Sequence, residues 1–180
     1  MLRDFNLLIT TMRGTETDAC SEVWYLLGEV GDMTPKVEKT GVAGLVAAKT
    51  AFNPHEVIEK LRQILKERPY EFRYSLRIIP IDRVVRTDLN EIQRVATELA
   101  LSKIKETESF RVTVEKRFTE TPSRDIIEAA ATNIERQVNL NNPDKIVLIE
   151  VVGGLTGISV VKPTDIIATT KEKFEPSKET

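Results

Sequence analysis

The sequence predicts an α+β protein made of two small domains. Its 180 residues suit one ordinary domain or two small ones, and 41% of them are hydrophobic, which is enough to bury a core. Short apolar runs typical of strands alternate with amphipathic helical patterns along most of the chain. One set of elements ends near residue 84 and a second set starts with a helix at Asp88, so we expect two domains.

Charge and composition exclude several classes of protein. The 26 Lys and Arg and 28 Asp and Glu give a net charge of −2, so a histone-like binder is excluded and any nucleic-acid surface is a local patch. One cysteine, Cys20, and one histidine, His55, exclude an intramolecular disulfide and a multi-histidine metal centre. No apolar run approaches the roughly 20 residues that cross a bilayer, and residues 1–6 lack a signal-peptide pattern. We expect a soluble cytoplasmic protein without cofactor, metal or membrane contact.

The first half predicts two amphipathic helices among four strands. One helix ends at Gly31, and the other begins at a capping residue, Asn53, and ends before Pro69. The strands are expected at residues 5–11, 36–38, 45–48 and 74–81. In order, these elements are β-α-β-β-α-β, which is the order of a ferredoxin-like domain with both helices on one face of an antiparallel sheet. We therefore expect residues 1–84 to form a ferredoxin-like domain.

The second half predicts a mixed α/β domain over residues 85–168. Asp88 caps its first helix, and a second helix opens after Pro122 with an apolar face that extends to Val138. Alternating and aliphatic runs predict strands at residues 110–115, 146–152 and 158–161. The remaining residues, 169–180, are charged and interrupted by proline, so we expect a disordered tail.

No catalytic constellation is visible in the sequence. Cys20 has no histidine near it in sequence and suits a structural thiol. The GxxG spacings that begin at Gly41 and Gly154 lie between predicted strands, which favours hairpin turns over the backbone clamp of a KH domain. Trp24 and Tyr25 adjoin the apolar face of a helix, where core packing is favoured over base stacking. We expect no catalytic residue and no enzyme activity.

Basic residues gather in the middle of the chain. Arg111, Lys116, Arg117 and Arg124 follow one predicted strand into the first turn of the next helix, where free amides and the helix dipole also favour phosphate. Adjacent Lys116 and Arg117 point to opposite faces of a regular strand, so they act together only at its end or at a bulge. On charge alone, a phosphate-binding patch and an ordinary solvated face are equally good interpretations.

The second half resembles a THUMP domain. Three features carry the resemblance: the segment Glu108–Arg117, the helix opened by Pro122-Ser123, and the segment Val138–Asp144 followed by an aliphatic strand. They match the family's "Phe-Arg-Val" strand, its helix and its "Val-Asp-Leu-x-x-Pro-Asp" segment, from which Asn139 and Asn142 depart. The resemblance covers about residues 85–165, and THUMP domains typically follow a ferredoxin-like domain.

The resemblance implies tRNA binding. THUMP modules grip the acceptor stem and 3′ end of tRNA and position another domain's active site on a distant nucleotide. The opening Leu7–Thr11 with Arg13-Gly14, and Cys20-Ser21-Glu22, are similar to stand-alone THUMP proteins. Those proteins assist RNA cytidine acetyltransferase in making N4-acetylcytidine in the D-arm of tRNAs for serine and leucine. Because the sequence ends soon after the THUMP segment, we expect an adaptor that presents tRNA to this separate enzyme.

On this interpretation, basic side chains of the second half contact RNA. The expected residues are Arg111, Lys116, Arg117 and Arg124, with Lys145 and Lys162 as weaker candidates. Two alternatives stay open: a protein-docking module with little RNA affinity of its own, and a THUMP subunit for another tRNA modification such as thiolation or methylation. An enzyme in its own right is disfavoured by the missing catalytic residues.

Overall fold

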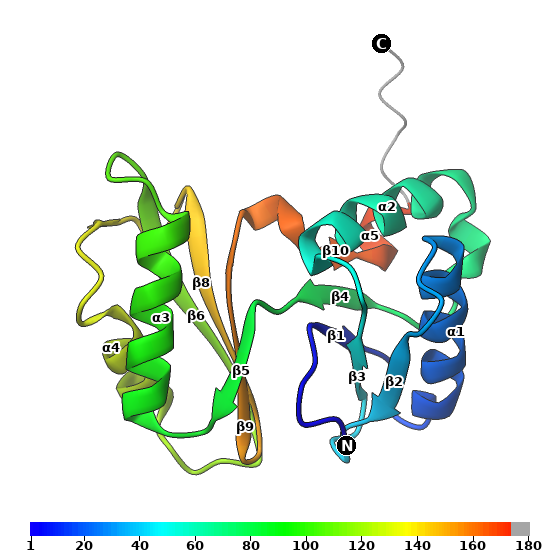
Figure 1. Cartoon of the computed structure of the whole chain (residues 1–180), viewed down its shortest axis with the longest axis horizontal. Helices are drawn as coiled ribbons and strands as arrows, with labels where there is room; N and C mark the ends of the chain where they lie inside the picture. The colour runs from blue at the N-terminus through cyan, green and yellow to red at the C-terminus, as the bar shows by residue number, and fades with distance from the viewer. Residues whose placement is uncertain (174–180) are drawn as a thin grey trace. The chain divides into compact units, whose positions relative to one another are not determined.

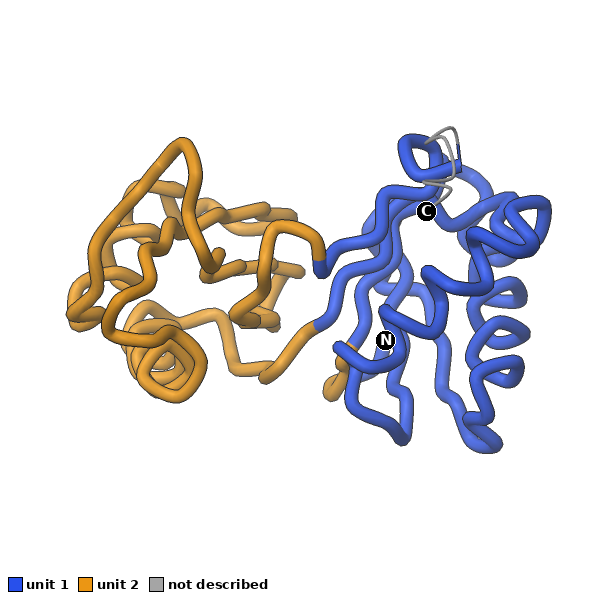
Figure 2. Tube along the Cα trace, turned by 90° about the horizontal axis from the view of Figure 1, so that it is seen from above, with its two compact units in different colours: residues 1–2, 7–80, 165–180 blue, residues 3–6, 81–164 orange. Residues whose placement is uncertain are grey.

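The protein divides into two compact units, which Figure 2 shows in different colours. The structure is a computed structural model that describes residues 1–173. Of the described residues, unit 1 takes 1–2, 7–80 and 165–173, and unit 2 takes 3–6 and 81–164. Each unit holds one five-stranded sheet, so the fold is mixed α/β. The division differs from a single boundary near residue 84, because the chain passes between the units more than once.

Unit 1 contains the expected β-α-β-β-α-β order. Its elements are β1 (Leu7–Thr10), α1 (Glu16–Glu29), β2 (Lys36–Lys39), β3 (Leu45–Lys49), α2 (Pro54–Glu67), the 3-10 turn η1 (Pro69–Glu71), β4 (Arg77–Pro80), β10 (Ile167–Ala168) and α5 (Thr169–Glu172). The strands pair antiparallel in the order β10-β4-β1-β3-β2. Buried side chains of α1 and α2 share one core with Leu7, Ile9 and Val46, which lie on the same face of the sheet because β1 and β3 pair in register.

Unit 2 places two helices on one face of a mixed sheet (Figure 1). Its elements are β5 (Arg83–Arg86), α3 (Leu89–Lys103), β6 (Ser109–Arg117), α4 (Ser123–Ala131), β7 (Gln137–Val138), β8 (Lys145–Val152) and β9 (Leu155–Val161), followed by the 3-10 turn η2 (Pro163–Asp165). The sheet order is β5-β9-β8-β6-β7, and β6 runs parallel to both β7 and β8. Asp88 caps α3 as expected, since its carboxylate accepts hydrogen bonds from the backbone N–H groups of Asn90 and Glu91.

The alternation of β6 decides where its basic residues point. Phe110, Val112 and Val114 contact the core beneath α3 and α4, so the even-numbered positions face the helices. Arg111 and Arg117, at odd-numbered positions, face the other side of the sheet. Lys116 and Arg117 therefore point in opposite directions, as the sequence predicted.

Two elements differ from the sequence-based expectation. The helix that opens after Pro122 ends at Ala131, and Val138 is 57% exposed in β7 instead of lying on a helical face. The reason is that the segment around Val138 becomes extended to pair with Phe110.

The expected tail also differs at its start. Residues 169–172 form α5, and Thr169 is buried with its hydroxyl donating to the backbone carbonyl of Ser75. A two-residue strand and a one-turn helix leave no periodic signal in the sequence, which is why the prediction missed them. The rest of that expectation, residues 174–180, lies outside the described residues.

Candidate nucleic-acid interface

The six basic residues expected to contact RNA lie at two different ends of unit 2. The strand β6 extends over nine residues, Ser109–Arg117. Arg111 and Lys116 are five positions apart on it, which is roughly 17 Å at about 3.3 Å per residue, and they point to opposite faces. We call the set Arg111, Lys145 and Lys162 the Arg111 end, and the set Lys116, Phe118 and Arg124 the α4 tip. One contiguous patch made from all six residues is therefore not formed.

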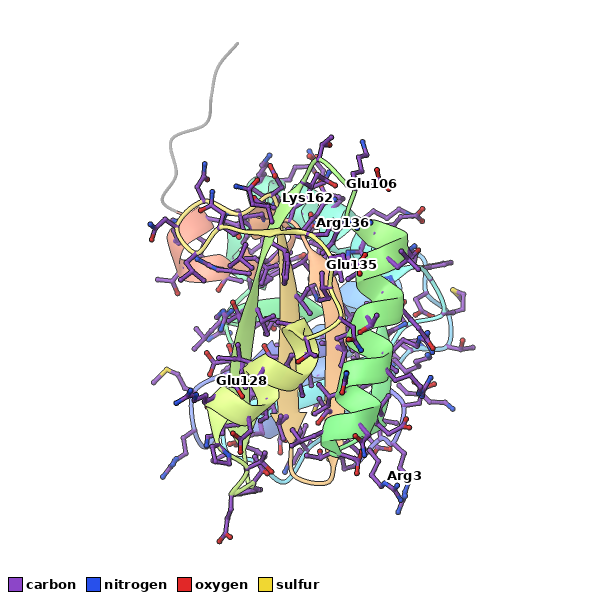
Figure 3. All side chains as sticks on the ribbon, turned by 90° about the vertical axis from the view of Figure 1, so that its left-hand side faces the viewer. Arg3, Glu106, Glu128, Glu135, Arg136 and Lys162 are labelled. Atoms are coloured by element: carbon purple, nitrogen blue, oxygen red, sulfur yellow. The ribbon has the colours of Figure 1, made fainter. Side chains whose placement is uncertain are left out.

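Strand register places the three residues of the Arg111 end at one end of the sheet. Phe110 lies opposite Lys145, and Ile146 lies opposite Val161, so Arg111, Lys145 and Lys162 come at or next to the corresponding ends of β6, β8 and β9. Lys145 shares the helix-facing side of the sheet with Phe110, whereas Arg111 points to the other face. Figure 3 shows Lys162 and Arg136 at this end of the unit, away from Glu128 on α4.

Two of these cations also hold the fold together. The Nζ of Lys145 donates to the backbone carbonyl of Lys103 at 3.0 Å, at the C-terminus of α3, and pairs with Glu108 at 3.1 Å. Its side chain is only 14% exposed. Arg111 donates from Nη1 to the carbonyl of Leu140 at 2.9 Å. Lys162 is exposed.

The segment that resembles the THUMP motif forms a turn beside Arg111. The side-chain oxygen of Asn139 accepts hydrogen bonds from the backbone N–H groups of Asn141 and Asn142, which closes the turn. Asp144 accepts from the backbone N–H and the hydroxyl of Ser109, at 2.8 and 3.1 Å. These hydrogen bonds, the backbone one first, lower the pKa of Asp144 below its ordinary value. The motif residues thus tie the loop to the start of β6.

Arg117 lies at the other end of β6, but its guanidinium is used inside the fold. Nη1 lies 2.7 Å from Oε2 of Glu150, whose side chain is fully buried, and the Arg117 side chain is 17% exposed. Burying a carboxylate is costly without a cationic partner. Arg117 therefore neutralises a core charge and presents little of its own to a ligand.

The α4 tip presents two cations and an open helix start. Nζ of Lys116 donates to the carbonyl of Thr121 at 3.1 Å, just before α4, while Lys116 itself is exposed. The Arg124 side chain is 87% exposed and pairs with Glu128 at 3.0 Å. Among residues 1–173 no side chain caps the N-terminus of α4, where Pro122 occupies the capping position. Free amides at a helix start attract anions.

Phe118 is the residue of this surface that sequence reasoning missed. It is 76% exposed and has φ of 56°, and it is the one residue other than glycine with positive φ between residues 1 and 173. An aromatic residue in this region costs about 1–2 kcal/mol. The signal in the sequence was an isolated aromatic directly after Lys116-Arg117, outside any apolar pattern. Exposed aromatic side chains next to cations suit stacking on nucleic-acid bases.

Acidic side chains limit the positive field of the α4 tip. Glu120, Asp125 and Glu128 lie on the same loop and helix as Lys116 and Arg124. The tip therefore offers a few local contacts instead of a broad basic surface.

Of two expectations about side chains of unit 1, the structure agrees with one and contradicts the other. Cys20 is partly buried, and this burial raises the pKa of its thiol, as expected for a structural cysteine. In contrast, the expected core packing of Trp24 and Tyr25 is wrong: their exposed fractions are 61% and 42%. Hydrogen bonds with Glu29 and Glu71 raise the pKa of Tyr25 to about 12.

Within residues 1–173 no three His, Cys, Asp or Glu side chains gather in a way that would hold a metal ion. Across the same residues, none of the helices combines the length and apolar character needed to cross a membrane.

The family comparison identifies the second unit. Residues 86–161 match the family model of the THUMP domain. The chain thus contains a THUMP domain, in the place where the sequence resemblance put it. A search of curated proteins found no match.

Several solved structures share the fold of both units. They include PH1313 from Pyrococcus horikoshii, with a TM-score of 0.65 and 21% identity over 87% of this chain and 54% of that one. TrmN from Thermus thermophilus has a TM-score of 0.58 and 18% sequence identity, over 87% of this chain and 45% of TrmN. A 4-thiouridine synthetase was solved as a complex with RNA and bound ATP. It has a TM-score of 0.54 and 17% sequence identity, over 88% of this chain and 42% of the synthetase. The chain spans about half the length of these proteins, and at such identities the likeness concerns the fold.

Proposed function

We propose that the chain binds tRNA and presents it to a separate RNA-modifying enzyme. The observation that carries the proposal is the THUMP domain at residues 86–161, because this domain is an RNA-binding module. The likeness to the 4-thiouridine synthetase supports it, since 88% of this chain, with parts of both units, is covered in a protein that was solved with RNA. We also class unit 1 as ferredoxin-like, on its β4-β1-β3-β2 order and its two helices on one face.

The proposed contact surface is the α4 tip. Lys116, Arg124 and the open start of α4 bind phosphates of the acceptor stem, and Phe118 stacks on an unpaired base of the 3′ end. Arg111 and Lys162 form a second, weaker contact, while Arg117 and Lys145 act indirectly by holding β6 and α3 in place. Phosphate contacts supply affinity without reading sequence, which suits an adaptor for several tRNAs.

The proposed modification is N4-acetylation of cytidine in the tRNA D-arm, with RNA cytidine acetyltransferase as the partner. It is supported by the similarity of Leu7–Thr11 and of the THUMP segment to stand-alone adaptors. Mass spectrometry of tRNA nucleosides from a deletion strain tests it: we expect N4-acetylcytidine to be lost. Loss of a thiolated or methylated nucleoside instead would assign the chain to another modification.

Binding by the α4 tip is tested with the variant Lys116→Ala/Arg124→Ala. In a filter-binding titration with a tRNA transcript, we expect the plot of log K against log salt to become shallower, with the magnitude of its negative slope reduced by about two. Arg94→Ala is the matched control, because Arg94 is also an exposed arginine that pairs with glutamates on a helix of the same unit. An unchanged slope in the double variant would remove the tip from the interface.

A further inference from the structure

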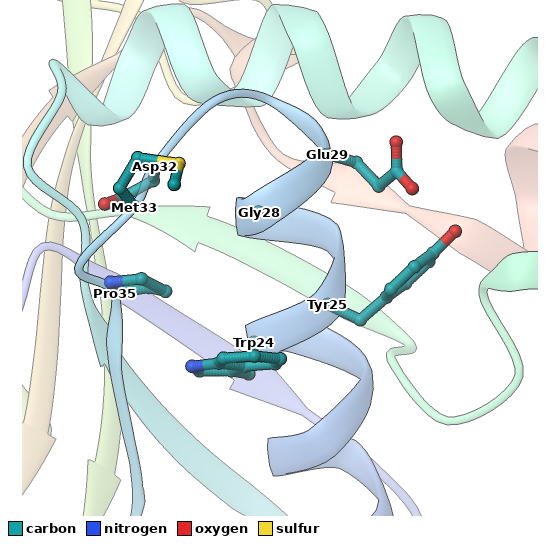
Figure 4. Close-up of a pocket in the computed structure, with 7 residues that line it drawn as sticks. All are labelled: Trp24, Tyr25, Gly28, Glu29, Asp32, Met33 and Pro35. Atoms are coloured by element: carbon teal, nitrogen blue, oxygen red, sulfur yellow. The ribbon is translucent and has the colours of Figure 1, made fainter.

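Unit 1 has a groove of about 370 Å³ beside the second half of α1 (Figure 4). Its lining residues come from α1 and from the segment that follows it: Trp24, Tyr25, Gly28, Glu29, Asp32 and Met33, with Pro35. The fold does not use this groove, because the core of the unit takes Ala19, Val23, Leu26 and Leu27 from α1.

Large apolar side chains at the groove are open to water. Trp24 is 61% exposed and Met33 is 89% exposed. Clustered apolar exposure of this kind marks interaction sites on proteins. Tryptophan and methionine are also enriched at protein interfaces, where they fill or adapt to pockets.

Gly28 opens the groove without being required by the fold. It lies one helical turn after Trp24, on the same face of α1. Its φ is not in the positive range, and an added Cβ would meet nothing within 4 Å. Glycine weakens a helix relative to alanine. Glycine at position 28 therefore makes α1 less stable than alanine would, and it leaves the floor of the groove open next to the indole of Trp24.

The charges around the groove are mainly negative. The charged residues of α1 are Glu16, Asp18, Glu22 and Glu29, and the helix carries no lysine or arginine. Among the lining residues, Glu29 and Asp32 are carboxylates and none is a cation. Asp32 is only 2% exposed, and its carboxylate accepts hydrogen bonds from Thr34, Thr50 and Ala51. Glu29 is therefore the carboxylate that the groove presents, and Arg68 offsets its charge only in part, at 3.6 Å. Such a surface repels phosphate and attracts basic groups.

We propose that this groove docks a protein segment in which an apolar side chain is flanked by lysines or arginines. The apolar side chain fills the groove over Gly28 against Trp24, and the basic residues face Glu29 at the C-terminal end of α1. The inference rests on the proposed function for the identity of the partner, which is then the modifying enzyme. RNA and protein are thus bound by different units of the chain.

Trp24 provides the test, because it is the single tryptophan of the sequence. The whole chain is titrated with a 12-residue peptide that has a central leucine between two pairs of lysines, and with a matched peptide carrying glutamates. We expect the lysine peptide alone to move the Trp24 emission to shorter wavelength, saturably and more weakly at high salt. Gly28→Leu should weaken this binding at least tenfold, and Thr17→Leu, on an exposed part of the same helix outside the groove, should not.

A charge variant covers the case in which Gly28→Leu disturbs the helix. Glu29→Lys adds little bulk and should weaken the lysine peptide while it admits the glutamate peptide. No emission shift with the lysine peptide, or equal shifts with both peptides, would overturn the proposal. A shift with a tRNA transcript would overturn it too, by making the groove an RNA site. Filter retention of tRNA is measured separately, so failure of the docking proposal is distinguishable from failure of tRNA binding.

Discussion

Arg117 illustrates how a basic residue in an RNA-binding unit can serve the fold. Its guanidinium lies 2.7 Å from the carboxylate of Glu150, whose side chain is fully buried. Arg117→Ala leaves that buried charge without the guanidinium, so we expect the free energy of unfolding to fall by about 3 kcal/mol in urea denaturation. The neighbouring exposed Lys116→Ala should change it by less than about 0.5 kcal/mol. Equal urea midpoints for the two variants would contradict this role. Binding tests should therefore leave Arg117 in place.

Phe118 combines backbone strain with exposure. Because glycine adopts positive φ without the steric cost that Phe118 carries at φ 56°, Phe118→Gly should raise the free energy of unfolding by about 1 kcal/mol. The same variant should bind tRNA several-fold more weakly, since the base loses its stacking partner. Urea denaturation and filter binding measure the two effects. A variant that is more stable and binds tRNA as tightly as the natural chain would leave Phe118 without a role in RNA binding.

Asp144 makes the stability of unit 2 sensitive to acid. Hydrogen bonds from Ser109 hold its pKa below the ordinary value of 3.8. A carboxyl group with a lowered folded-state pKa stabilises the fold at pH above its unfolded-state pKa, and this contribution is lost as pH falls through the folded-state pKa. Asp144→Asn should therefore be less stable than the natural chain at neutral pH, and the difference should shrink below about pH 3.8. Urea midpoints across this range measure it, and a constant difference would contradict the account.

At the scale of elements, the N-terminus of α3 depends on one side chain. The carboxylate of Asp88 accepts hydrogen bonds from the N–H groups of Asn90 and Glu91 at 2.9 and 3.1 Å. Asp88→Ala should lower the free energy of unfolding by about 1 kcal/mol, whereas Asp88→Asn keeps a capping oxygen and should cost much less. Thermal unfolding of both variants compares them. If asparagine is as destabilising as alanine, the cap does not explain the stability of this helix start.

Long periodic elements were predictable from the sequence, and short ones were not. The capping residues Asn53 and Asp88 fixed the starts of α2 and α3, because a cap is a local hydrogen bond. The early end of α4 escaped prediction, since it depends on Val138 pairing with a strand distant in sequence. The elements β10 and α5 escaped for the same reason: their hydrogen bonds reach back to β4 and to Ser75.

The candidate site was predictable only in its residue types. Strand alternation correctly placed Lys116 and Arg117 on opposite faces. The partner of Arg117, Glu150, is distant in sequence and becomes visible only through the parallel pairing of β6 with β8. Sequence reasoning missed the exposure of Trp24 because this residue borders the apolar face of α1. Periodicity shows where the centre of such a face lies, but it does not show whether a residue at its border is buried.

At the scale of the whole molecule, each unit depends on a distant segment of the chain. Gly157 of β9 lies against Phe5 and Ile81, so residues 3–6 belong to unit 2 although they precede β1. In unit 1, Arg62 of α2 pairs with Glu172 of α5 at 2.7 Å. A cut near residue 84 would separate both units from these segments. Binding experiments therefore require the whole chain.

Binding of tRNA by the whole chain tests the central claim most directly. The measurement is a filter-binding titration with a tRNA transcript at low ionic strength, with an acceptor-stem minihelix and a D-arm hairpin as competitors. We expect saturable binding that weakens as salt rises, because phosphate contacts release counterions, and we expect the minihelix to compete better than the hairpin. If no tRNA is retained even at low salt, the proposed tRNA-binding function is contradicted.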